Sequence, residues 1–233
     1  MKTSAVRSVD SDGKEKMVFR VHDVPSIHDN FFEAEFFSRQ GSDFIRDFPA
    51  DIPGASEAAG NFRTHGMEMF RPVMSGEPVD WRAGLLAFIE RMEGLGQGIP
   101  WFLTGSCALT VRGIDVQPSD VDFVFPRFSD MERVGQIFRK ETVYPFCDCG
   151  DWVTRGYGAA WMHAILAMAF EPLACLDDPF PIDSGPAAIE NLEKVSWMGR
   201  EISVPPLEYC LNINRRRERT ERVELLEKII GKG

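Results

Sequence analysis

The stretch TGSCALTVRGIDVQPSDVDFVF, residues 104–125, decides the fold of this chain. Its Gly-Ser turn opens a short apolar segment that we expect to form a helix over 105–112, closed by Gly113. A loop with one proline follows, and the run DVDFVF then predicts a strand over 121–125. The stretch therefore predicts a helix that leads by a loop into a strand with two aspartates.

Asp120 and Asp122 are separated by a single valine. In a strand they point to the same side, with Cα atoms roughly 6.6 Å apart. Two unpaired carboxylates side by side repel each other and raise a pKa, and a bound divalent cation removes that cost. Since ligation by oxygen alone favours Mg²⁺ or Mn²⁺ over Zn²⁺, the pair predicts a magnesium or manganese site.

Gly105 and Ser106 stand where a short apolar strand, expected over 101–103, turns into the helix. Glycine lets a ligand approach the backbone, and free N–H groups at a helix start favour a phosphate, to which the Ser106 hydroxyl can add a hydrogen bond. Alone, the aspartate pair could be a surface Asx turn or the metal-binding Asp-x-Asp of a nucleotide-sugar glycosyltransferase. Neither alternative requires Gly-Ser one helix upstream, so the combination favours a polyphosphate with its metals.

These residues resemble the signature of the DNA polymerase β-like nucleotidyltransferase superfamily, in which an apolar strand, Gly-Ser, a spacer and Asp-x-Asp follow in this order. The chain is most similar to small bacterial members such as the aminoglycoside and lincosamide nucleotidyltransferases, from residue 80 onward. The resemblance implies transfer of a nucleoside monophosphate from an NTP to an acceptor hydroxyl, with release of pyrophosphate. It implies that Asp120 and Asp122 hold Mg²⁺ and that Gly105 and Ser106 bind the terminal phosphates.

The family takes a third carboxylate from a later strand, and the resemblance places it at Glu171, as metal ligand and general base. Glu171 follows AILAMAF, residues 164–170, which predicts a strand although its composition also suits a helix. Asp177 and Asp178, in an expected loop past Pro172, are the alternative. Without a third carboxylate the chain would be a silent nucleotide-binding or partner-binding member of the fold, such as one component of a toxin–antitoxin pair.

Helix and strand signals are regular from Asp80, which is expected to cap a helix ended by Gly94 and Gly96. They predict an α/β or α+β domain over 79–233, with a small mixed sheet flanked by helices. Further elements are expected as a helix after Ser129, a hairpin over 195–204 and helices after Pro206 and around 223–230.

Residues 1–78 differ from the rest and are expected to be an extension that is partly helical and rich in loops. The leader is polar, residues 27–37 carry phenylalanines at roughly helical spacing, and 51–78 has several Gly and Pro without a clean period. We expect the amphipathic segment to pack on the main domain, with binding of a partner helix as the alternative.

The 233-residue chain has a net charge of −10 and 44% hydrophobic residues, enough for a real core. The charge disfavours nucleic acid as the acceptor and leaves a small molecule or a protein. Neither a membrane span nor a signal peptide is indicated, so a cytoplasmic protein is expected. The five cysteines do not suggest a disulfide framework or a complete zinc site.

Several other side chains have both a structural and a functional interpretation. The basic run of residues 215–222 is most simply a solvated helix face with local ion pairs, and the alternative lets one of its arginines reach the triphosphate. Arg155, Tyr157 and Trp161 could line an acceptor or base pocket, whereas His163 is expected to be a packing residue.

Overall fold

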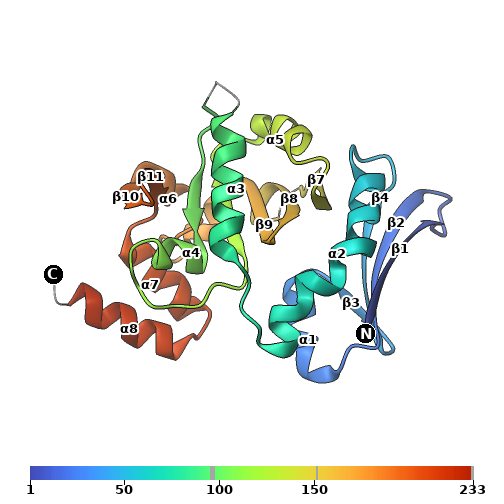
Figure 1. Cartoon of the computed structure of the whole chain (residues 1–233), viewed down its shortest axis with the longest axis horizontal. Helices are drawn as coiled ribbons and strands as arrows, with labels where there is room; N and C mark the ends of the chain where they lie inside the picture. Colours follow the sequence, from blue (N-terminus) through green and yellow to red (C-terminus); the bar gives the residue numbers. More distant parts are fainter. Residues whose placement is uncertain (95–97, 151, 232–233) are drawn as a thin grey trace.

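The computed structural model describes residues 1–94, 98–150 and 152–231, which form two larger sheets with helices around them (Figure 1). The two sheets belong to different parts of the sequence. One is built by the first 50 residues, and the other carries the stretch 104–125. The α+β class is thus confirmed, with helices flanking a mixed sheet.

The second sheet has five strands in the order β5-β6-β9-β8-β7. Neighbouring strands are antiparallel except β6 and β9, which run parallel and place Asp122 across from Ala167. The strands predicted over 121–125 and 164–170 are both confirmed, and the strand expected over 101–103 begins one residue later. The bounds are β5 Phe102–Thr104, β6 Val121–Phe125, β7 Thr142–Asp148, β8 Thr154–Met162 and β9 Ala164–Pro172.

Helix α3 (Trp81–Glu93) covers one face of this sheet. Asp80 caps it as predicted, since its Oδ1 accepts a hydrogen bond of 3.0 Å from the Ala83 N–H, and the helix ends at Gly94, while Gly96 lies outside the described residues. Phe88 stacks on Phe123, with ring centroids 3.6 Å apart, so α3 supports the back of β6 directly behind the aspartates.

The remaining elements of this half follow the predicted order. The helix after the Gly-Ser turn is confirmed as α4, and the hairpin as β10 and β11, joined through Met198 and Gly199. The bounds are α4 Gly105–Thr110, α5 Met131–Ile137, α6 Pro186–Glu190, β10 Glu193–Trp197, β11 Arg200–Val204, α7 Leu207–Arg216 and α8 Thr220–Ile230, with 3-10 turns η2 Phe128–Asp130 and η3 Ala174–Asp177.

Residues 1–78 are partly helical, as expected, but they form a sheet and a long helix where a polar leader and a loop were expected. The polar leader forms β1 (Lys2–Val9) and β2 (Glu15–His22), which join an antiparallel sheet in the order β1-β2-β4-β3. Of the amphipathic segment only a short part is helical. The other bounds are η1 Ser26–His28, α1 Asp29–Ala34, β3 Ser38–Gln40 and β4 Asp43–Pro49.

The segment 51–78, expected to be a loop, contains the longest helix described, α2 (Ala55–Ser75). Its glycines weaken the local helical signal, but packing explains one of them: a Cβ on Gly66 would lie 2.6 Å from Thr3 Cγ2 on β1. Tertiary packing of its buried face therefore outweighs propensity. That face consists of Ala55, Ala58, Ala59, Phe62, Gly66, Met69 and Phe70.

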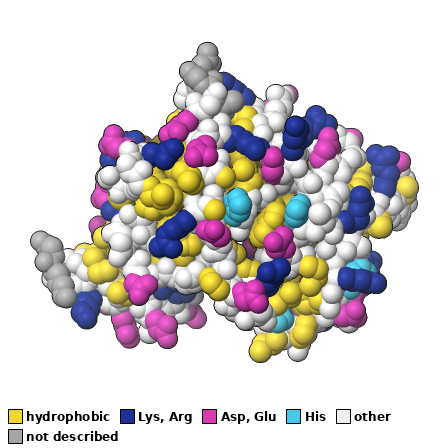
Figure 2. Space-filling model, viewed as in Figure 1, with side chains coloured by type: hydrophobic (Ala, Val, Ile, Leu, Met, Phe, Trp, Pro, Cys, Tyr) yellow, Lys and Arg dark blue, Asp and Glu magenta, His cyan; other side chains and the backbone are white. Residues whose placement is uncertain are grey.

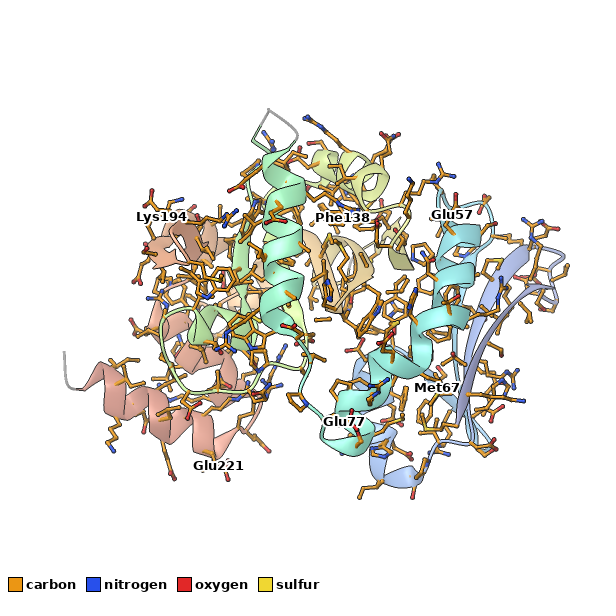
Figure 3. All side chains as sticks on the ribbon, viewed as in Figure 1. Glu57, Met67, Glu77, Phe138, Lys194 and Glu221 are labelled. Atoms are coloured by element: carbon orange, nitrogen blue, oxygen red, sulfur yellow. The ribbon has the colours of Figure 1, made fainter. Side chains whose placement is uncertain are left out.

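Helix α2 joins the two sheets through a shared core. Its buried face packs with the N-terminal strands and also with Val143, Tyr144 and Ala159 of β7 and β8. At one end Arg139 Nη2 lies 2.6 Å from Oε1 of Glu57, which is labelled on α2 in Figure 3. The expected boundary after residue 78 falls between α2 and α3, although the two parts are packed together.

Charged side chains of both signs are scattered over the face seen in Figure 2. None of the helices in the described ranges is both long enough and apolar enough to span a bilayer. The two parts of the molecule meet at a buried apolar interface.

Candidate nucleotide site

The Gly-Ser turn and the second aspartate fit against each other. Gly105 has φ +64°, and a Cβ built on it would lie 2.5 Å from Oδ2 of Asp122. Only glycine accepts both this backbone conformation and this close approach of a carboxylate. The register agrees, because Thr104 at the end of β5 pairs with Asp122 on β6. The structure thus brings Gly105 and Asp122 together, as their combination in the sequence suggested.

Asp120 and Asp122 are both half-buried at the start of β6, while Val121 and Phe123 are buried in the core. Burial raises the pKa of Asp122 well above its usual range, and the charge of Asp120 raises it further. The pKa of Asp120 is also raised by burial, against hydrogen bonding from Ser119 and the charge of Arg217. The two carboxylates thus feel each other and are poorly hydrated, which is the arrangement predicted for a cation site.

A third carboxylate, Asp183, completes this corner and was missed from the sequence. It is 5% exposed, its Oδ2 accepts a hydrogen bond of 3.1 Å from the Gly105 N–H, and its charge helps to raise the pKa of Asp122. The expectation of a free N–H at Gly105 is therefore wrong. No local pattern marks Asp183, which stands alone in the loop before α6.

The alternative acids Asp177 and Asp178 do not join the site by hydrogen bonding within the described residues. Asp177 accepts hydrogen bonds from the N–H groups of Ile182 and Ala187, at 3.0 and 2.7 Å. It thereby shapes the loop that carries Asp183. The Asp178 carbonyl accepts a hydrogen bond from Arg216.

The basic run divides between a structural and a site-facing part. Arg215 pairs with Glu227 at 2.7 Å, as expected for a solvated helix face. By contrast, Arg222 Nη1 donates a hydrogen bond of 2.8 Å to Ser106 Oγ, and the charges of Arg217 and Arg219 lower the pKa of Asp120. The bend between α7 and α8 turns these arginines toward the aspartates, so the structure favours the alternative interpretation of the run.

Glu171 lies at the wrong place for a third ligand. It is on β9 as predicted, but Ala167 is the residue paired with Asp122, and four residues at 3.3 Å place Glu171 roughly 13 Å further along the strand. Its Oε2 accepts a hydrogen bond of 3.2 Å from the Phe128 N–H, and its Oε1 lies 3.6 Å from Arg155 Nη1. The structure therefore does not bring Glu171 to the aspartates.

A different glutamate approaches from the N-terminal part of the chain. Glu35, directly after α1, is half-buried, and burial together with the charge of Asp120 raises its pKa to about 7, against the opposite effect of Arg46. Its charge in turn raises the pKa of Asp122. Sequence reasoning missed Glu35 because residues 27–37 were interpreted as a packing helix.

Of the three residues that could line an acceptor or base pocket, the structure places only Tyr157 near the aspartates. Tyr157 on β8 lies near the site, since the charges of Glu35 and Asp122 raise its pKa after burial has done so. Trp161 packs against the core shared with α2. Arg155 contacts Glu171, and its guanidinium lies 4.3 Å from the ring centroid of Phe128.

The donor set fits a metal bound jointly with a ligand. Within residues 1–94, 98–150 and 152–231, no three His, Cys, Asp or Glu side chains are grouped closely enough to hold a metal by themselves. Mg²⁺ is usually held by one or two carboxylates together with substrate phosphates and water rather than by an all-protein cage. Asp120 and Asp122 supply that number of carboxylates.

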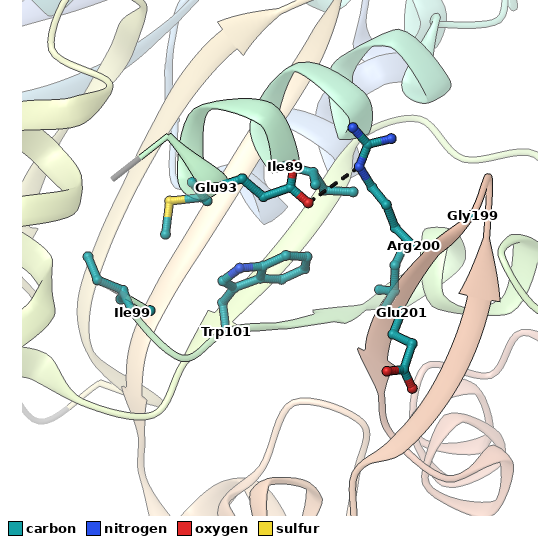
Figure 4. A pocket seen from close by; sticks show the side chains of 10 residues that line it. Ile89, Glu93, Ile99, Trp101, Gly199, Arg200 and Glu201 are labelled. Atoms are coloured by element: carbon teal, nitrogen blue, oxygen red, sulfur yellow. Dashed lines mark ion pairs between the residues drawn. The ribbon is translucent and has the colours of Figure 1, made fainter. Parts of the chain in front are cut away.

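A pocket of about 430 Å³ lies elsewhere (Figure 4). It is formed by the end of α3, the start of β5 and the β10–β11 turn, and an ion pair of 3.4 Å between Arg200 and Glu93 borders it. Neither the Gly-Ser turn nor the aspartates line it. The pocket and the cluster of chemically reactive side chains are therefore at different places. We place the functional site with the chemistry.

No protein-family model and no curated protein sequence matches this chain. Among solved structures, a Thermotoga maritima protein described provisionally as a nucleotidyltransferase is similar over 68% of this chain and 99% of its own, with a TM-score of 0.47 and 17% identity. A likeness at this level does not assign an activity. The function of the chain therefore has to be inferred from the residues that its fold brings together.

Proposed function

We propose that the chain binds a nucleoside triphosphate with Mg²⁺ or Mn²⁺ and transfers the nucleoside monophosphate to an acceptor hydroxyl. One observation carries this proposal: the Asp122 carboxylate lies against Gly105, Asp120 raises its pKa, and the adjacent Ser106 hydroxyl is bound by Arg222. Acidic groups for a cation and basic groups for phosphates thus meet at one turn. A metal-bound polyphosphate satisfies both sets at once.

Asp120 and Asp122 would hold the metal, which supplies charge neutralisation at the phosphates when bound. The carboxylates themselves keep the cation at the start of β6, a position fixed by the stack of Phe123 on Phe88. A rigid strand serves this purpose because the carboxylates do not have to be ordered again when the nucleotide arrives.

The basic side chains bind the other end of the nucleotide. Ser106 and Arg222, which are joined by a hydrogen bond, would contact the β- and γ-phosphates, and the charges of Arg217 and Arg219 act on the neighbouring Asp120. In the reaction, the acceptor oxygen forms a bond to the α-phosphorus as the bond to the β-phosphate oxygen breaks, and pyrophosphate leaves. Arginines stabilise the charge that develops on this leaving group.

The acceptor is expected to be a small molecule or a protein. The net charge of −10 opposes a broad contact with a nucleic acid backbone. The arginines whose charges act on Asp120 come from the single short segment 217–222, which suits one triphosphate better than a polynucleotide.

A second candidate is nucleotide binding without transfer. It is favoured by Ala167, which occupies the β9 position across from Asp122, and by the distance of Glu171 from the aspartates. A chain of this kind would act as a nucleotide-controlled binding partner, for instance in a toxin–antitoxin pair. Conversion of the triphosphate to pyrophosphate distinguishes the two candidates.

Titration calorimetry with ATP, GTP, CTP and UTP tests the binding step. We expect binding of at least one nucleotide with Mg²⁺ or Mn²⁺ and loss of that binding in EDTA or on Asp120→Asn. Asp115→Asn, an exposed aspartate in the preceding loop, is the matched control and should bind as the wild type does. Equal affinity with and without the metal would contradict the proposed site.

A further inference from the structure

A serine, a histidine and an aspartate lie next to one another on three neighbouring strands of the N-terminal sheet. Ser4 is on β1, His22 ends β2 and Asp43 begins β4. Ser4 pairs with Arg20, two residues before His22, and the next position of the β2–β4 ladder sets His22 beside Asp43. We call Ser4, His22 and Asp43 the Ser–His–Asp row.

The row lies on the face of the sheet that α2 does not cover. Ala5, Val21 and Phe44, which are sequence neighbours of the row, are buried in the core shared with α2, and alternate residues of a strand point to opposite faces. In Figure 1, α2 stands between these strands and the second sheet. The side chains of the row are half-buried, so solvent reaches them. This surface therefore shares no residue with the candidate nucleotide site.

Two contacts join the row. Ser4 Oγ lies 2.8 Å from His22 Nε2, and His22 Nδ1 lies 3.1 Å from Asp43 Oδ2. Asp43 is ionised at neutral pH, because the Asp23 N–H and Arg20 hold its pKa at about 2. An ionised carboxylate only accepts hydrogen bonds, so Nδ1 carries the proton and Nε2 of the neutral imidazole accepts from the Ser4 hydroxyl. In this order of contacts a histidine takes the proton of a nucleophilic serine.

The Asp43 carboxylate is held in place without the help of the histidine. Its Oδ1 accepts hydrogen bonds from the Asp23 N–H at 3.1 Å and from the Ser42 hydroxyl at 3.3 Å. Its Oδ2 accepts a hydrogen bond of 3.0 Å from Arg20 Nη1. The carboxylate can therefore orient the imidazole without moving. A network that served only to satisfy Asp43 would not need to extend through a histidine to a serine hydroxyl.

Donors for a negatively charged oxygen are found beside the serine. Arg20 is the cross-strand partner of Ser4, and the bond to Asp43 is the one side-chain hydrogen bond found for it within the described ranges. Its other N–H groups can donate to an oxygen that becomes negative at Ser4. Because β1 is an edge strand, part of its main-chain N–H groups also point away from the sheet.

We propose that Ser4 is the nucleophile of a second catalytic site, which hydrolyses carboxylic esters with short apolar acyl groups, and that His22 is its general base, oriented by Asp43. This activity is independent of the proposed nucleotide function. Ser4 Oγ bonds to the carbonyl carbon while its proton passes to His22 Nε2. The ester C–O bond then breaks, and the alcohol leaves with that proton. Water adds to the acyl-serine by the same proton transfers and releases the acid.

The acyl class follows from the surface next to the serine. Val6 is two residues beyond Ser4 on the same face of β1 and is 56% exposed. An apolar acyl group on Ser4 can cover this side chain and remove apolar surface from water. The face of a sheet offers contact to few atoms of a ligand, so a short acyl group is expected.

The first experiment treats the whole chain with diisopropyl fluorophosphate, which forms a bond from a nucleophilic serine oxygen to phosphorus as fluoride leaves. Fragment spectra of the tryptic peptide 3–7, in which Ser4 is the one serine, locate the adduct. We expect Ser4 to be labelled in the wild type and about 10²-fold or more slowly in His22→Gln. Ser8→Ala, on the same face of β1, is the matched control and should be labelled on Ser4 like the wild type. Equal labelling of Ser4 in the wild type and in His22→Gln would overturn the proposal.

The second experiment measures release of p-nitrophenolate from p-nitrophenyl acetate and butyrate. Ser4→Ala should give the uncatalysed rate, and His22→Gln should lower kcat about 10²–10⁴-fold with an unchanged KM. Asp43→Asn should also lower kcat, since a neutral amide no longer selects the required imidazole tautomer. Turnover in Ser4→Ala equal to that of the wild type would overturn the proposal.

Val6→Ser tests the acyl class. It should raise the KM for the butyrate about fourfold, the effect of about one buried CH₂ group, and leave the KM for the acetate unchanged. An unchanged KM for both esters would overturn the assignment of Val6.

The wild type alone separates a catalytic row from a structural one. If Ser4 of the folded wild type takes no label and neither ester is turned over, the row is a structural network and the proposal fails, even if variants of the row lower the melting temperature. Asp43→Asn keeps the shape of the side chain, so its kcat can be measured if His22→Gln does not fold.

Discussion

Asp43 on β4 and Asp122 on β6 are both strand aspartates, but their surroundings differ. Asp43 Oδ1 accepts a hydrogen bond from the Asp23 N–H at 3.1 Å, and its Oδ2 lies 3.0 Å from Arg20 and 3.1 Å from His22. Asp122 instead lies against Gly105, near the further carboxylates of Asp120, Asp183 and Glu35.

The pKa values move accordingly in opposite directions. The Asp23 N–H, followed by Arg20, holds the pKa of Asp43 at about 2, whereas burial and then Asp120 raise that of Asp122 well above its usual range. In the N-terminal sheet the fold itself neutralises the charge. At β6 the charge of Asp122 is only partly offset, by Arg217, at a cost to stability.

The largest expected effect comes from Asp122→Asn. Loss of one of the two carboxylates proposed to bind the metal should abolish metal-dependent ATP binding in calorimetry. The melting temperature of the metal-free protein should stay the same or rise, because an ionised carboxylate with a raised pKa lowers the stability of the folded state, and asparagine carries no charge. A marked fall in melting temperature would instead make Asp122 a structural residue like Asp43.

Glu35→Gln should give an intermediate effect on stability that depends on pH. A folded-state pKa raised from 4.5 to about 7 leaves the stability contribution of Glu35 intact below pH 4.5 and removes it as the pH rises through 7. The variant should therefore match the wild type at pH 4.5 and exceed it by up to about 3 kcal/mol at pH 8, measured by urea unfolding. The same difference in unfolding free energy between variant and wild type at pH 4.5 and at pH 8 would show that Glu35 is not desolvated.

Asp43→Asn should have the smallest effect, and with the opposite sign. Because the pKa of Asp43 is lowered from 3.8 to about 2, its stabilisation is present above pH 3.8 and is lost as the pH falls through 2. The variant should be slightly less stable at pH 6 and equal at pH 2, and added salt should reduce the difference. A gain in stability at pH 6 would remove the contrast with Asp122.

The elements that could be predicted from the sequence depend on local patterns. The capping residue Asp80 predicts α3, the apolar run that begins at Val121 predicts β6, and Gly199 predicts the β10–β11 turn. The N-terminal sheet escaped prediction because its apolar face is covered by α2 and by Val143 and Tyr144, which lie far along the chain. Helix α2 escaped because its fit on Thr3 requires the glycine at 66 that weakens its helical signal.

The same division applies to the candidate site. Gly105, Ser106, Asp120 and Asp122 belong to one short stretch whose spacing carries chemistry, and the fold keeps Gly105 against Asp122. Asp183, Arg222 and Glu35 arrive from separate segments, and nothing near them in the sequence indicates where they meet. Glu171 shows the limit of the pattern: its strand was predicted, but the register that sets its distance from Asp122 was not.

The packing of α2 across both sheets has a consequence for the order of synthesis. The ribosome completes α2 at Ser75 but finishes β8 at Met162 roughly 90 residues later, a delay of roughly 4–18 s at typical translation speeds. During that interval Phe62 and Phe70 can bury against the N-terminal strands, but the part of their surroundings made by Tyr144 and Ala159 does not yet exist. A nascent chain at this stage exposes an apolar helix face, which is a surface that chaperones bind and that aggregation uses.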